Sequence, residues 1–289
     1  MVTAIITTYN RKAEIVLKAL LSVLNQTYRV EEIIVVDDNP FSIPERKELN
    51  PISLEIKNLL LKYDNVRYIK NPNGNTGANY ARNIGIKNSN GDFIAFLDDD
   101  DEWFPHKIEK QLSAFAEDTE EVGLVFCTGI DKYTVKGKIM EKEYYTCKYF
   151  VENPTFEELL RQDLIGSTSN PLIKKCVFEK AGMFDVNMPA RQDYDMWLRI
   201  SRFYKIKGIN FKGFSYNHNE DNRITKSKLK AYKAYNLIYF KYYEFYKKDL
   251  IAWFSIQRYI SVNQSGLIGW IKSIVIRLIR FMLLLFAKK

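Results

Sequence analysis

The chain has 289 residues and a mass of 34.0 kDa, enough for one large domain with a tail or for two modest domains with a substantial core. Its 46% hydrophobic and 27% charged content argues against a disordered chain and against a polytopic membrane protein. The formal net charge of +8 favours an anionic partner, which could be nucleic acid, an anionic lipid surface or a phosphorylated substrate.

The cysteines and the first residues bear on the cellular compartment. Three cysteines, Cys127, Cys147 and Cys176, form no C-x-x-C pair and no cluster with histidine, so neither a disulfide framework nor a zinc site is predicted. Val2–Thr8 lacks the basic start and the cleavage site of a signal peptide, and it is predicted to be a first strand. We therefore expect the catalytic part to stay in the reducing cytoplasm.

The first 130 residues alternate short apolar runs with segments of helical periodicity, which is typical of β-α-β units and a mainly parallel sheet. The predicted strands are Thr3–Thr8, Glu32–Asp37, Val66–Lys70, Phe93–Leu97 and Gly123–Cys127. The predicted helices are Lys12–Leu24, Thr76–Lys87 and His106–Ala116. In the first of these helices, the apolar residues recur every three or four positions and should face a sheet.

Beyond residue 130 the pattern changes three times. Ile130–Thr146 is rich in lysine and tyrosine and predicts a hairpin or edge insertion. Residues 155–224 mix short helices and strands, and we expect them to shape the site of a second substrate. Lys228–Tyr246 carries tyrosines at helical spacing, which favours aromatic packing on one helix face over a ligand surface.

The last apolar segment, Leu267–Phe286, predicts a helix whose polar residues share one arc. Its three cations, Lys272, Arg277 and Arg280, would each cost about 2.5–3.5 kcal/mol at the centre of a bilayer. An amphipathic helix lying in the plane of the membrane, with its basic residues toward lipid headgroups, is therefore favoured over a spanning helix. The alternative is a helix that packs on the domain or on a second subunit.

Four consecutive carboxylates, Asp98–Asp101, directly follow a predicted buried strand. Adjacent negative charges repel one another, so a fold keeps them where solvent or a cation relieves the repulsion. Clusters of carboxylate oxygens suit hard divalent ions, which also bridge phosphate oxygens. The run therefore indicates a metal site, with a solvated acidic turn as the alternative.

Two further carboxylates lie where predicted elements begin or end. Asp38 ends the run Val35-Val-Asp-Asp38, where it could bond to a base or to ribose hydroxyls, or else cap a turn. Asp193 opens a predicted helix that buries Tyr194, Trp197 and Leu198. Asp193 is therefore a candidate general base, with a helix N-cap as the alternative.

Across about residues 1–220, the chain resembles the family 2 glycosyltransferases of the GT-A fold. The resemblance rests on five motifs in order: Ile5-Ile-Thr-Thr-Tyr-Asn-Arg11, Val35-Val-Asp-Asp38, Asn75-Thr-Gly-x-x-x-Ala-Arg-Asn-x-Gly85, Asp98-x-Asp100 and Gln192-Asp193. It implies an α/β fold with a Rossmann-like, mainly parallel nucleotide-binding sheet over residues 1–224. Residues 225–289 are expected to form a helical extension that contains the amphipathic segment 267–286.

The resemblance also implies the residues of the donor site. These are Thr7, Tyr9, Arg11, Asp38, Gly77, Arg82, Asp98 and Asp99, with Arg82 either near the phosphates or bracing its loop. Two departures from the usual pattern occur. Asn39-Pro-Phe-Ser42 follows Asp38 in place of the common Gly-Ser, and Gln192 replaces a frequent glutamate.

For catalysis, the resemblance implies a divalent metal, Mn²⁺ or Mg²⁺, with Asp100 as its direct ligand and His218 near the metal and the pyrophosphate. Asp193 matches the catalytic base, and Arg223 is expected to support the charge of the departing diphosphate. Single displacement by an acceptor hydroxyl would then invert the anomeric centre.

The resulting prediction is an inverting hexosyl transfer from a nucleotide sugar, expected to be a UDP-sugar. The acceptor would be a hydroxyl of a glycan or lipid-linked molecule in cell-surface polysaccharide synthesis, at the cytoplasmic face of the plasma membrane. A sugar-phosphate nucleotidyltransferase is the alternative enzyme, but it should carry a glycine-rich phosphate loop after the first strand. No G-x-G-x-x-G follows a strand, which disfavours dinucleotide oxidoreduction.

The non-enzymatic alternative is a sugar-binding or scaffolding relative that kept the fold but lost activity. The presence of Asp100 and Asp193 argues against it. Nucleic-acid binding is disfavoured because the basic residues concentrate in apolar, tyrosine-rich C-terminal segments.

Overall fold

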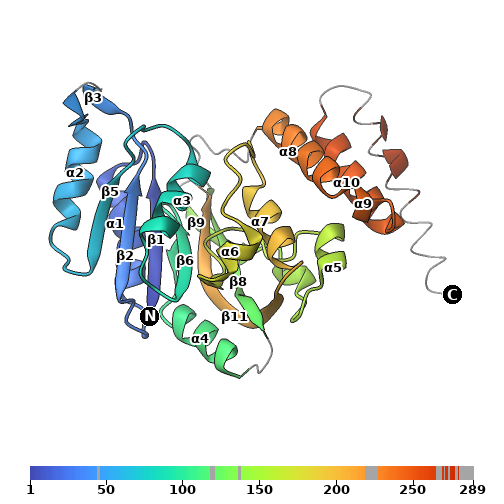
Figure 1. The fold of residues 1–289 in the computed structure, drawn as a ribbon, viewed down its shortest axis with the longest axis horizontal. Helices are drawn as coiled ribbons and strands as arrows, with labels where there is room; N and C mark the ends of the chain where they lie inside the picture. The colour runs from blue at the N-terminus through green and yellow to red at the C-terminus, as the bar shows by residue number, and fades with distance from the viewer. Residues whose placement is uncertain are drawn as a thin grey trace.

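A computed structural model describes residues 1–43, 46–117, 121–135, 138–218 and 227–264, and seven more between 269 and 279. A nine-stranded sheet runs through the molecule in the order β5-β2-β1-β6-β10-β8-β11-β7, with β9 paired to β8 (Figure 1). Helices cover both of its faces. This is the α/β architecture that the sequence predicts.

The parallel half of the sheet consists of β5 (Val66–Lys70), β2 (Glu32–Asp37), β1 (Val2–Thr8) and β6 (Phe93–Asp98). These four strands agree with the predicted ones to within one residue at either end. They form where β-branched and aromatic residues follow one another, because such side chains pack well on a pleated surface.

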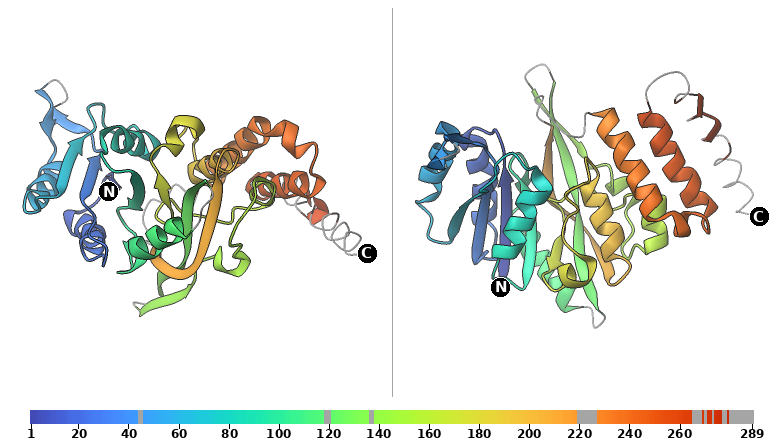
Figure 2. Two further views of the ribbon diagram at one scale, coloured as in Figure 1. Left: turned by 60° about the horizontal axis from the view of Figure 1, so that its bottom comes forward. Right: turned by 45° about the horizontal axis from the view of Figure 1, so that its top comes forward.

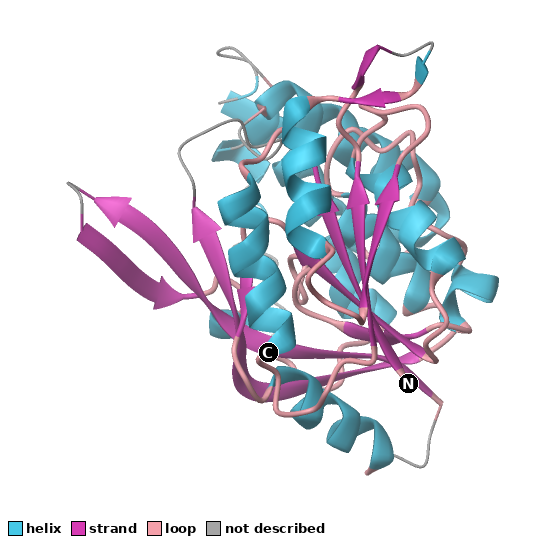
Figure 3. Ribbon diagram, turned by 90° about the vertical axis from the view of Figure 1, so that its left-hand side faces the viewer, coloured by secondary structure: helices cyan, strands magenta, loops and turns pink. Residues whose placement is uncertain are grey.

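The other half of the sheet is mixed. It contains β10 (Leu172–Lys174), β8 (Val122–Val135), β11 (Lys205–His218), β7 (Glu102–Trp103) and β9 (Lys138–Glu143). β10 runs antiparallel to both of its neighbours, whereas β8 and β11 are parallel. The predicted hairpin is confirmed, although its first strand is the end of the long β8; Figure 3 shows this two-stranded ribbon extending from the sheet. A separate pair, β3 (Phe41–Ile43) and β4 (Glu48–Leu49), forms a small sheet.

Alternate residues of each central strand face opposite sides of the sheet, and each side has its own core. Ile5 and Phe96 belong to one hydrophobic cluster, whereas Ile6 and Leu97 belong to the other. The second cluster is covered by α1 (Ala13–Leu24), α2 (Pro51–Leu60) and α4 (Lys107–Ala116). The first is covered by α3 (Ala78–Asn88), α5 (Phe156–Arg161), α6 (Val177–Ala181) and α7 (Gln192–Ile200).

The C-terminal helices extend the first cluster. α8 (Lys228–Lys241), α9 (Tyr243–Tyr246) and α10 (Leu250–Asn263) follow one another, and α8 and α10 lie side by side in both views of Figure 2. Tyr235, Tyr242 and Tyr246 are buried in the same cluster as Trp197, so the predicted aromatic packing is confirmed. The predicted boundary at residue 224 and most of the segment 267–286 lie outside the described residues.

Trp197 should dominate the stability of this region. Its side chain is fully buried, and its Nε1 donates to the carbonyl oxygen of Gly166 at 2.8 Å. We expect Trp197→Ala to lower the free energy of unfolding by about 3–5 kcal/mol, through the cavity and the orphaned carbonyl. Phe240→Ala is the control, because Phe240 is 70% exposed and should cost less than about 0.5 kcal/mol. Denaturant unfolding of both variants tests this, and equal losses would contradict it.

Candidate active site

The ends of three neighbouring parallel strands meet at one edge of the sheet. In the register of β1 with its neighbours, Thr7 lies opposite Asp98 on β6, and Thr8 lies opposite Asp37 on β2. The residues that follow these strands therefore gather together, as carboxyl ends of parallel strands do. Tyr9 lies at this edge with 47% of its surface exposed, and Thr7 is half-buried.

Arg11 holds two of the four consecutive carboxylates. Its Nε donates to Asp99 Oδ1 at 3.1 Å, and its Nη2 donates to Asp100 Oδ2 at 2.7 Å. The preceding residue, Asn10, turns the chain with a φ of 52°, a left-handed conformation that asparagine tolerates. The family resemblance implied that Arg11 lies near the nucleotide or its phosphates, and the structure shows it bound to the acidic turn, Asp98–Asp101.

Asp38 organises the loop that begins α3. Its buried carboxylate accepts from the backbone N–H groups of Thr76 at 3.1 Å and Gly77 at 2.7 Å, from the Thr76 hydroxyl at 3.0 Å, and from Asn71. Gly77 has a φ of 94°, which favours glycine, and it is the N-cap residue of α3. This carboxylate is thus a structural anchor of the predicted nucleotide site.

Arg82 points from α3 toward the acidic turn. Its Nη2 donates to Asp98 Oδ1 at 2.6 Å, and its guanidinium lies 5.5 Å from the centre of the Phe184 ring. The other two nitrogens, Nε and Nη1, are buried and have no hydrogen-bond partner among the described residues. Unpaired buried donors are costly, so Arg82 is suited to bind a further acceptor group, such as a phosphate oxygen.

Burial and charge repulsion raise the pKa values of two carboxyls of the acidic turn. Burial and the Asp100 charge raise the pKa of Asp99 to about 7, although Arg11 opposes them. Burial, Asp100 and Asp98 together raise the pKa of Asp101 well above its usual range, even though it accepts from Ser169 Oγ at 2.6 Å and from Asn217 N at 3.0 Å. Carboxylate oxygens are the ligands that hard divalent cations prefer. Within the described ranges, however, no group of three or more His, Cys, Asp or Glu side chains is arranged to hold such an ion.

Asp193 lies in the first turn of α7. The N-cap of this helix is Arg191, with a φ of 55°. The alternative role of Asp193 as the helix N-cap is therefore wrong. Its Oδ1 accepts from the backbone N–H of Tyr194 at 2.8 Å. Burial, followed by the charge of Asp163, raises the pKa of Asp193 to about 6; Arg191, that N–H group and Arg82 act in the opposite direction. A carboxyl with this pKa is ionised at neutral pH and basic enough to take up a proton.

Hydrogen bonds link α3 to the segment before α7, and another links residues 163–170 to the acidic turn. On α3, Asn79 Nδ2 donates to the carbonyl oxygen of Asp185 and Asn83 Nδ2 donates to that of Phe184, each at 2.8 Å. Both carbonyls belong to the segment that leads into α7. From residues 163–170, Thr168 donates to Asp98 Oδ1 at 3.3 Å. Arg82, which bonds to Asp98, is also one of the charges that lower the pKa of Asp193.

His218 lies at the end of β11. Its Nε2 is 2.7 Å from Asp131 Oδ1, and its ring packs edge-on against Tyr216 with the centroids 5.1 Å apart. Its neighbour Asn217 contacts the acidic turn directly, donating to the Asp100 carbonyl oxygen at 2.7 Å. Successive strand residues point to opposite faces, which separates the two side chains. Arg223 lies outside the described residues.

Four side chains near the site were not predicted from the sequence. Thr168, Ser169 and Asn217 bond to the acidic turn, and the charge of Asp163 acts on Asp193. Each is a common polar residue in a segment without a recognisable motif, so no local signal marks it. Their partners are 30 to 117 positions away along the chain.

A hollow lies elsewhere on the molecule. It has a volume of about 1050 Å³ and is open to solvent. Its lining comes from the start of α5, residues 201–206 and Phe245, and it shares no residue with the acidic turn or with Asp193.

Comparison with known proteins places the chain in a family. Residues 3–178 match the family model described as glycosyl transferase family 2, which covers more than half of the sequence. The chain belongs to this family. The motifs of the sequence predicted this membership.

Curated relatives in this family come from several bacteria. The chain is 30% identical over 213 residues to an uncharacterized glycosyltransferase of Rickettsia prowazekii, covering 73% of this chain and 61% of that relative. It is 28% identical over 217 residues to the Escherichia coli UDP-Glc:alpha-D-GlcNAc-diphosphoundecaprenol beta-1,3-glucosyltransferase WfgD, covering 73% of each. Other Rickettsia relatives are much longer, and the chain spans 28% of the one from Rickettsia bellii and 32% of the one from Rickettsia felis.

Solved structures support the same fold. Staphylococcus aureus TarS, residues 1–349 in complex with UDP-GlcNAc, matches with a TM-score of 0.60 and 16% identity, covering 94% of this chain and 69% of that one. The match confirms the GT-A architecture of this family 2 chain.

Proposed function

We propose that this chain is an inverting, metal-dependent glycosyltransferase that moves a sugar from a UDP-sugar to a hydroxyl of a glycan or lipid-linked acceptor in cell-surface polysaccharide synthesis. One observation carries the proposal. Arg82 donates to Asp98 at the acidic turn and is also one of the charges that lower the pKa of Asp193, which supports assigning the donor-side and base-side carboxylates to one cleft. Such an arrangement suits the transfer of a group from a diphosphate to an activated hydroxyl.

The donor site is assigned to the edge of the sheet where β1, β2 and β6 end. Thr7, Tyr9 and Asp38 would form the nucleoside pocket, with Gly77 beside it. Arg11, Arg82, Asp98 and Asp99 would line the side of the ribose and diphosphate. The unpaired nitrogens of Arg82 support this assignment, and so do the donors named for WfgD, UDP-Glc, and for the TarS complex, UDP-GlcNAc.

We assign a divalent cation to the carboxylates of the acidic turn because such ions prefer carboxylate oxygens. Asp100 is proposed as its direct ligand. His218 is proposed as a second ligand, and its ring, which pairs with Asp131 at 2.7 Å, would have to turn toward Asp100 to bind the ion. When bound, Mn²⁺ or Mg²⁺ would supply Lewis-acid neutralisation of the charge that develops on the leaving diphosphate. In this chain, Arg11 already contributes one positive charge at Asp99 and Asp100, so it is positioned to stabilise the same diphosphate.

Asp193 is proposed as the general base. Its carboxylate would take the proton from the acceptor hydroxyl while that oxygen attacks the anomeric carbon on the side opposite the leaving group. Base catalysis of this kind contributes about 10²–10⁴-fold to the rate. A single displacement of this type inverts the anomeric configuration.

The test of the function is a panel of nucleotide sugars, assayed for hydrolysis and transfer with Mn²⁺ or Mg²⁺. We expect turnover of at least one UDP-sugar that depends on the divalent ion and forms a product of inverted configuration. A sugar-phosphate nucleotidyltransferase would instead make a nucleotide sugar from a sugar phosphate and a nucleoside triphosphate. Turnover of that pair, without any sugar transfer, would contradict the proposal.

The pH dependence should report Asp193. Because its pKa is raised to about 6, the carboxyl is protonated below this pH and cannot act as a base. We expect kcat/KM, measured at saturating divalent ion, to fall about tenfold per pH unit below pH 6 and to level off above it. The residual kcat/KM of the Asp193→Asn variant should show no such fall below pH 6. A wild-type midpoint near 4, the range of an ordinary aspartate, would contradict the assignment.

The segment 267–286 is proposed to hold the enzyme at the inner leaflet of the plasma membrane. Among its described residues, Ile271, Ile274 and Val275 expose 47%, 39% and 47% of their surfaces, and Lys272 is exposed as well. Within the described part of the chain, the structure contains no helix with the length and apolar character needed to cross a bilayer. Exposed apolar residues beside a cation are typical of a helix that lies in the membrane interface.

Vesicle flotation tests this location. The full chain is expected to float with vesicles that contain anionic lipid, whereas a chain ending at Gln264 should stay in the dense fractions. A Leu61→Ser variant of the full chain is the control, because Leu61 is 72% exposed but lies at the end of α2. Equal flotation of the full and shortened chains would refute the anchor.

A further inference from the structure

The guanidinium of Arg11 pairs with the two middle carboxylates of the acidic turn. Its Nε donates to Asp99 Oδ1 at 3.1 Å, and its Nη2 donates to Asp100 Oδ2 at 2.7 Å. The exposed fractions of the side chains are 20% for Arg11, 9% for Asp99 and 11% for Asp100. Because so little water reaches these charges, solvent screens their attraction weakly, and the pair is held firmly.

The two outer carboxylates of the acidic turn also accept hydrogen bonds from the protein. Asp98 accepts from Arg82 Nη2 at 2.6 Å. Asp101 accepts from Ser169 Oγ at 2.6 Å and from the backbone N–H of Asn217 at 3.0 Å. All four carboxylates are thus engaged by the protein itself. This explains why the acidic side chains of the described residues are not arranged around an ion, although their oxygens suit one.

The backbone around Arg11 is fixed between the two parts of the donor site. Asn10 donates its backbone N–H to Asn39 Oδ1 at 2.7 Å, and α1 begins at Ala13. Asn39 directly follows Asp38, so Arg11 stands between the loop assigned to the nucleotide and the acidic turn. Its side chain is long and has several rotatable bonds, and a guanidinium binds phosphate as readily as carboxylate. A change of rotamer is therefore enough to exchange one partner for the other.

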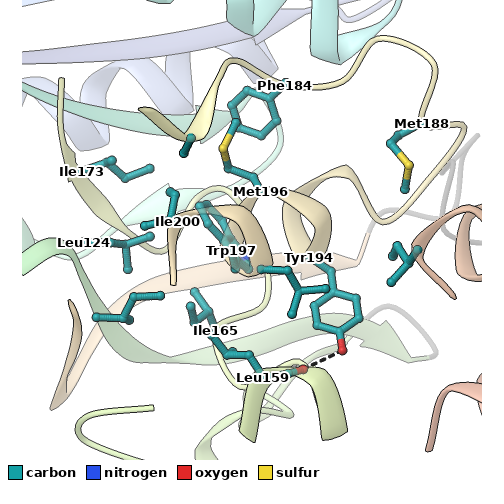
Figure 4. Close-up of a cluster of buried hydrophobic side chains, with 14 of the residues drawn as sticks. Leu124, Leu159, Ile165, Ile173, Phe184, Met188, Tyr194, Met196, Trp197 and Ile200 are labelled. Carbon is teal, nitrogen blue, oxygen red and sulfur yellow. Dashed lines mark hydrogen bonds between the residues drawn. The ribbon is translucent and has the colours of Figure 1, made fainter. Parts of the chain in front are cut away.

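Arg82 gives independent evidence that an anion binds beside this turn. Its side chain is 4% exposed, and its buried Nε and Nη1 have no hydrogen-bond partner among the described residues. Its guanidinium lies 5.5 Å from the centre of the Phe184 ring, which belongs to the buried cluster shown in Figure 4. Arg82 is thus a fixed cation with two unused donors, and phosphate oxygens would satisfy them.

We propose that Arg11 is the resident counter-ion of the acidic turn and couples binding of the divalent ion to binding of the nucleotide diphosphate. Without nucleotide, its guanidinium holds Asp99 and Asp100 and repels an approaching cation. A diphosphate bound at Arg82 offers Arg11 a second anionic partner, and its departure releases the two carboxylates to the ion. The proposal rests on the metal and nucleotide site proposed above. It adds that the ion binds firmly with the nucleotide and weakly before it.

The consequence is a coupling between two ligands that Arg11 strengthens. If the guanidinium must leave before the ion binds firmly, then removing it should favour the ion most when nucleotide is absent. A residue that only braces the turn predicts the reverse, because its loss would disorder the carboxylates and weaken binding of the ion. A general effect of the lost charge would favour the ion equally with and without nucleotide.

The direct test is Mn²⁺ binding by the full chain, followed through the EPR signal of the free ion, with and without UDP and corrected for Mn²⁺ bound to UDP in solution. In the wild type, UDP should tighten Mn²⁺ binding. In Arg11→Gln, Mn²⁺ alone should bind about tenfold tighter than to the wild type, within the range of typical couplings. The factor by which UDP tightens Mn²⁺ binding should shrink by a similar amount.

Arg67→Gln is the matched control. Arg67 also pairs with a carboxylate, Glu32 Oε1 at 2.6 Å, but Glu32 lies at the start of β2, at the other end of the strand from Asp38. Loss of this arginine should leave Mn²⁺ binding unchanged with and without UDP. Arg11→Lys keeps the charge but loses the planar fork, so its UDP factor should lie between those of the wild type and Arg11→Gln. It replaces the glutamine variant if that one does not fold.

A second measurement follows Arg11 in the wild-type chain labelled with ¹⁵N-arginine. Its Nε–Hε resonance, assigned with Arg11→Lys, should move when UDP and Mg²⁺ are added together and stay in place with Mg²⁺ alone. A resonance that ignores the pair, or that moves with Mg²⁺ alone, would overturn the proposal.

The Mn²⁺ titrations separate this proposal from the proposed function. If the wild type binds Mn²⁺ with UDP, but Arg11→Gln shows the same UDP factor or weaker binding of the ion alone, the role given to Arg11 is wrong and the metal site stands. If no variant binds Mn²⁺ even with UDP, the metal-dependent function falls together with it.

Discussion

Replacing Asp193 with asparagine is expected to lower kcat for sugar transfer by about 10²–10⁴-fold and to leave the KM for the donor nearly unchanged. Asparagine has the same shape and can still accept from the Tyr194 N–H group, but it cannot take the proton of the acceptor hydroxyl. The donor contacts, which lie at the strand ends, remain intact. The measurement is steady-state kinetics with the UDP-sugar that the panel identifies.

The same variant should not lose stability. Because the pKa of Asp193 is raised in the folded chain, ionising this carboxyl costs folding free energy as the pH rises through about 6. Removing the charge should therefore leave the free energy of unfolding at pH 7 equal or higher. Loss of activity together with lower stability would point to a damaged fold instead, and full activity would exclude Asp193 as the base.

Asp100→Ala is expected to reduce divalent-ion-dependent turnover by about 10²–10³-fold, since neutralising the diphosphate contributes several kcal/mol to the transition state. The apparent affinity for Mn²⁺ should fall as well. Removing one of four adjacent carboxylates also relieves repulsion, so the pKa values of Asp99 and Asp101 should decrease. Metal titrations of activity and of binding by calorimetry test both parts.

Asp92→Ala is the control for this prediction. Asp92 is an exposed carboxylate at the opposite edge of the sheet, where it pairs with the N-terminal amine at 3.0 Å. Its loss should change neither the turnover nor the metal dependence. If Asp100→Ala kept the wild-type dependence on divalent ions, the metal site assigned to the acidic turn would be wrong.

Prediction from the sequence succeeded where short-range patterns decide the structure. Glu32–Asp37 and Val66–Lys70 are strands with the predicted bounds, because consecutive β-branched and aromatic residues favour an extended, buried backbone. It was less complete for β8, which continues to Val135 through lysine and tyrosine. Those residues are extended because β11 and β9 pair with them on both sides, and no local pattern encodes that pairing.

The order of the motifs was enough to indicate the family and to place Thr7, Asp38 and Asp98 at one edge, since the carboxyl ends of parallel strands coincide. The contacts that define the site required the tertiary structure. Arg11 reaches Asp99 and Asp100 across 88 and 89 positions, and Asn217 reaches Asp100 across 117.

The sequence by itself thus determined the four strands β5, β2, β1 and β6, the edge at which they end and the carboxylates found there, because these follow from the period of the backbone and the direction of parallel strands. Only the tertiary structure decided which charges meet. Asp163 acts on Asp193 because buried hydrogen bonds from Tyr194 and Trp197 hold one loop against α7. The strength of such an interaction depends on distance and burial in space, and neither quantity is written in the local sequence.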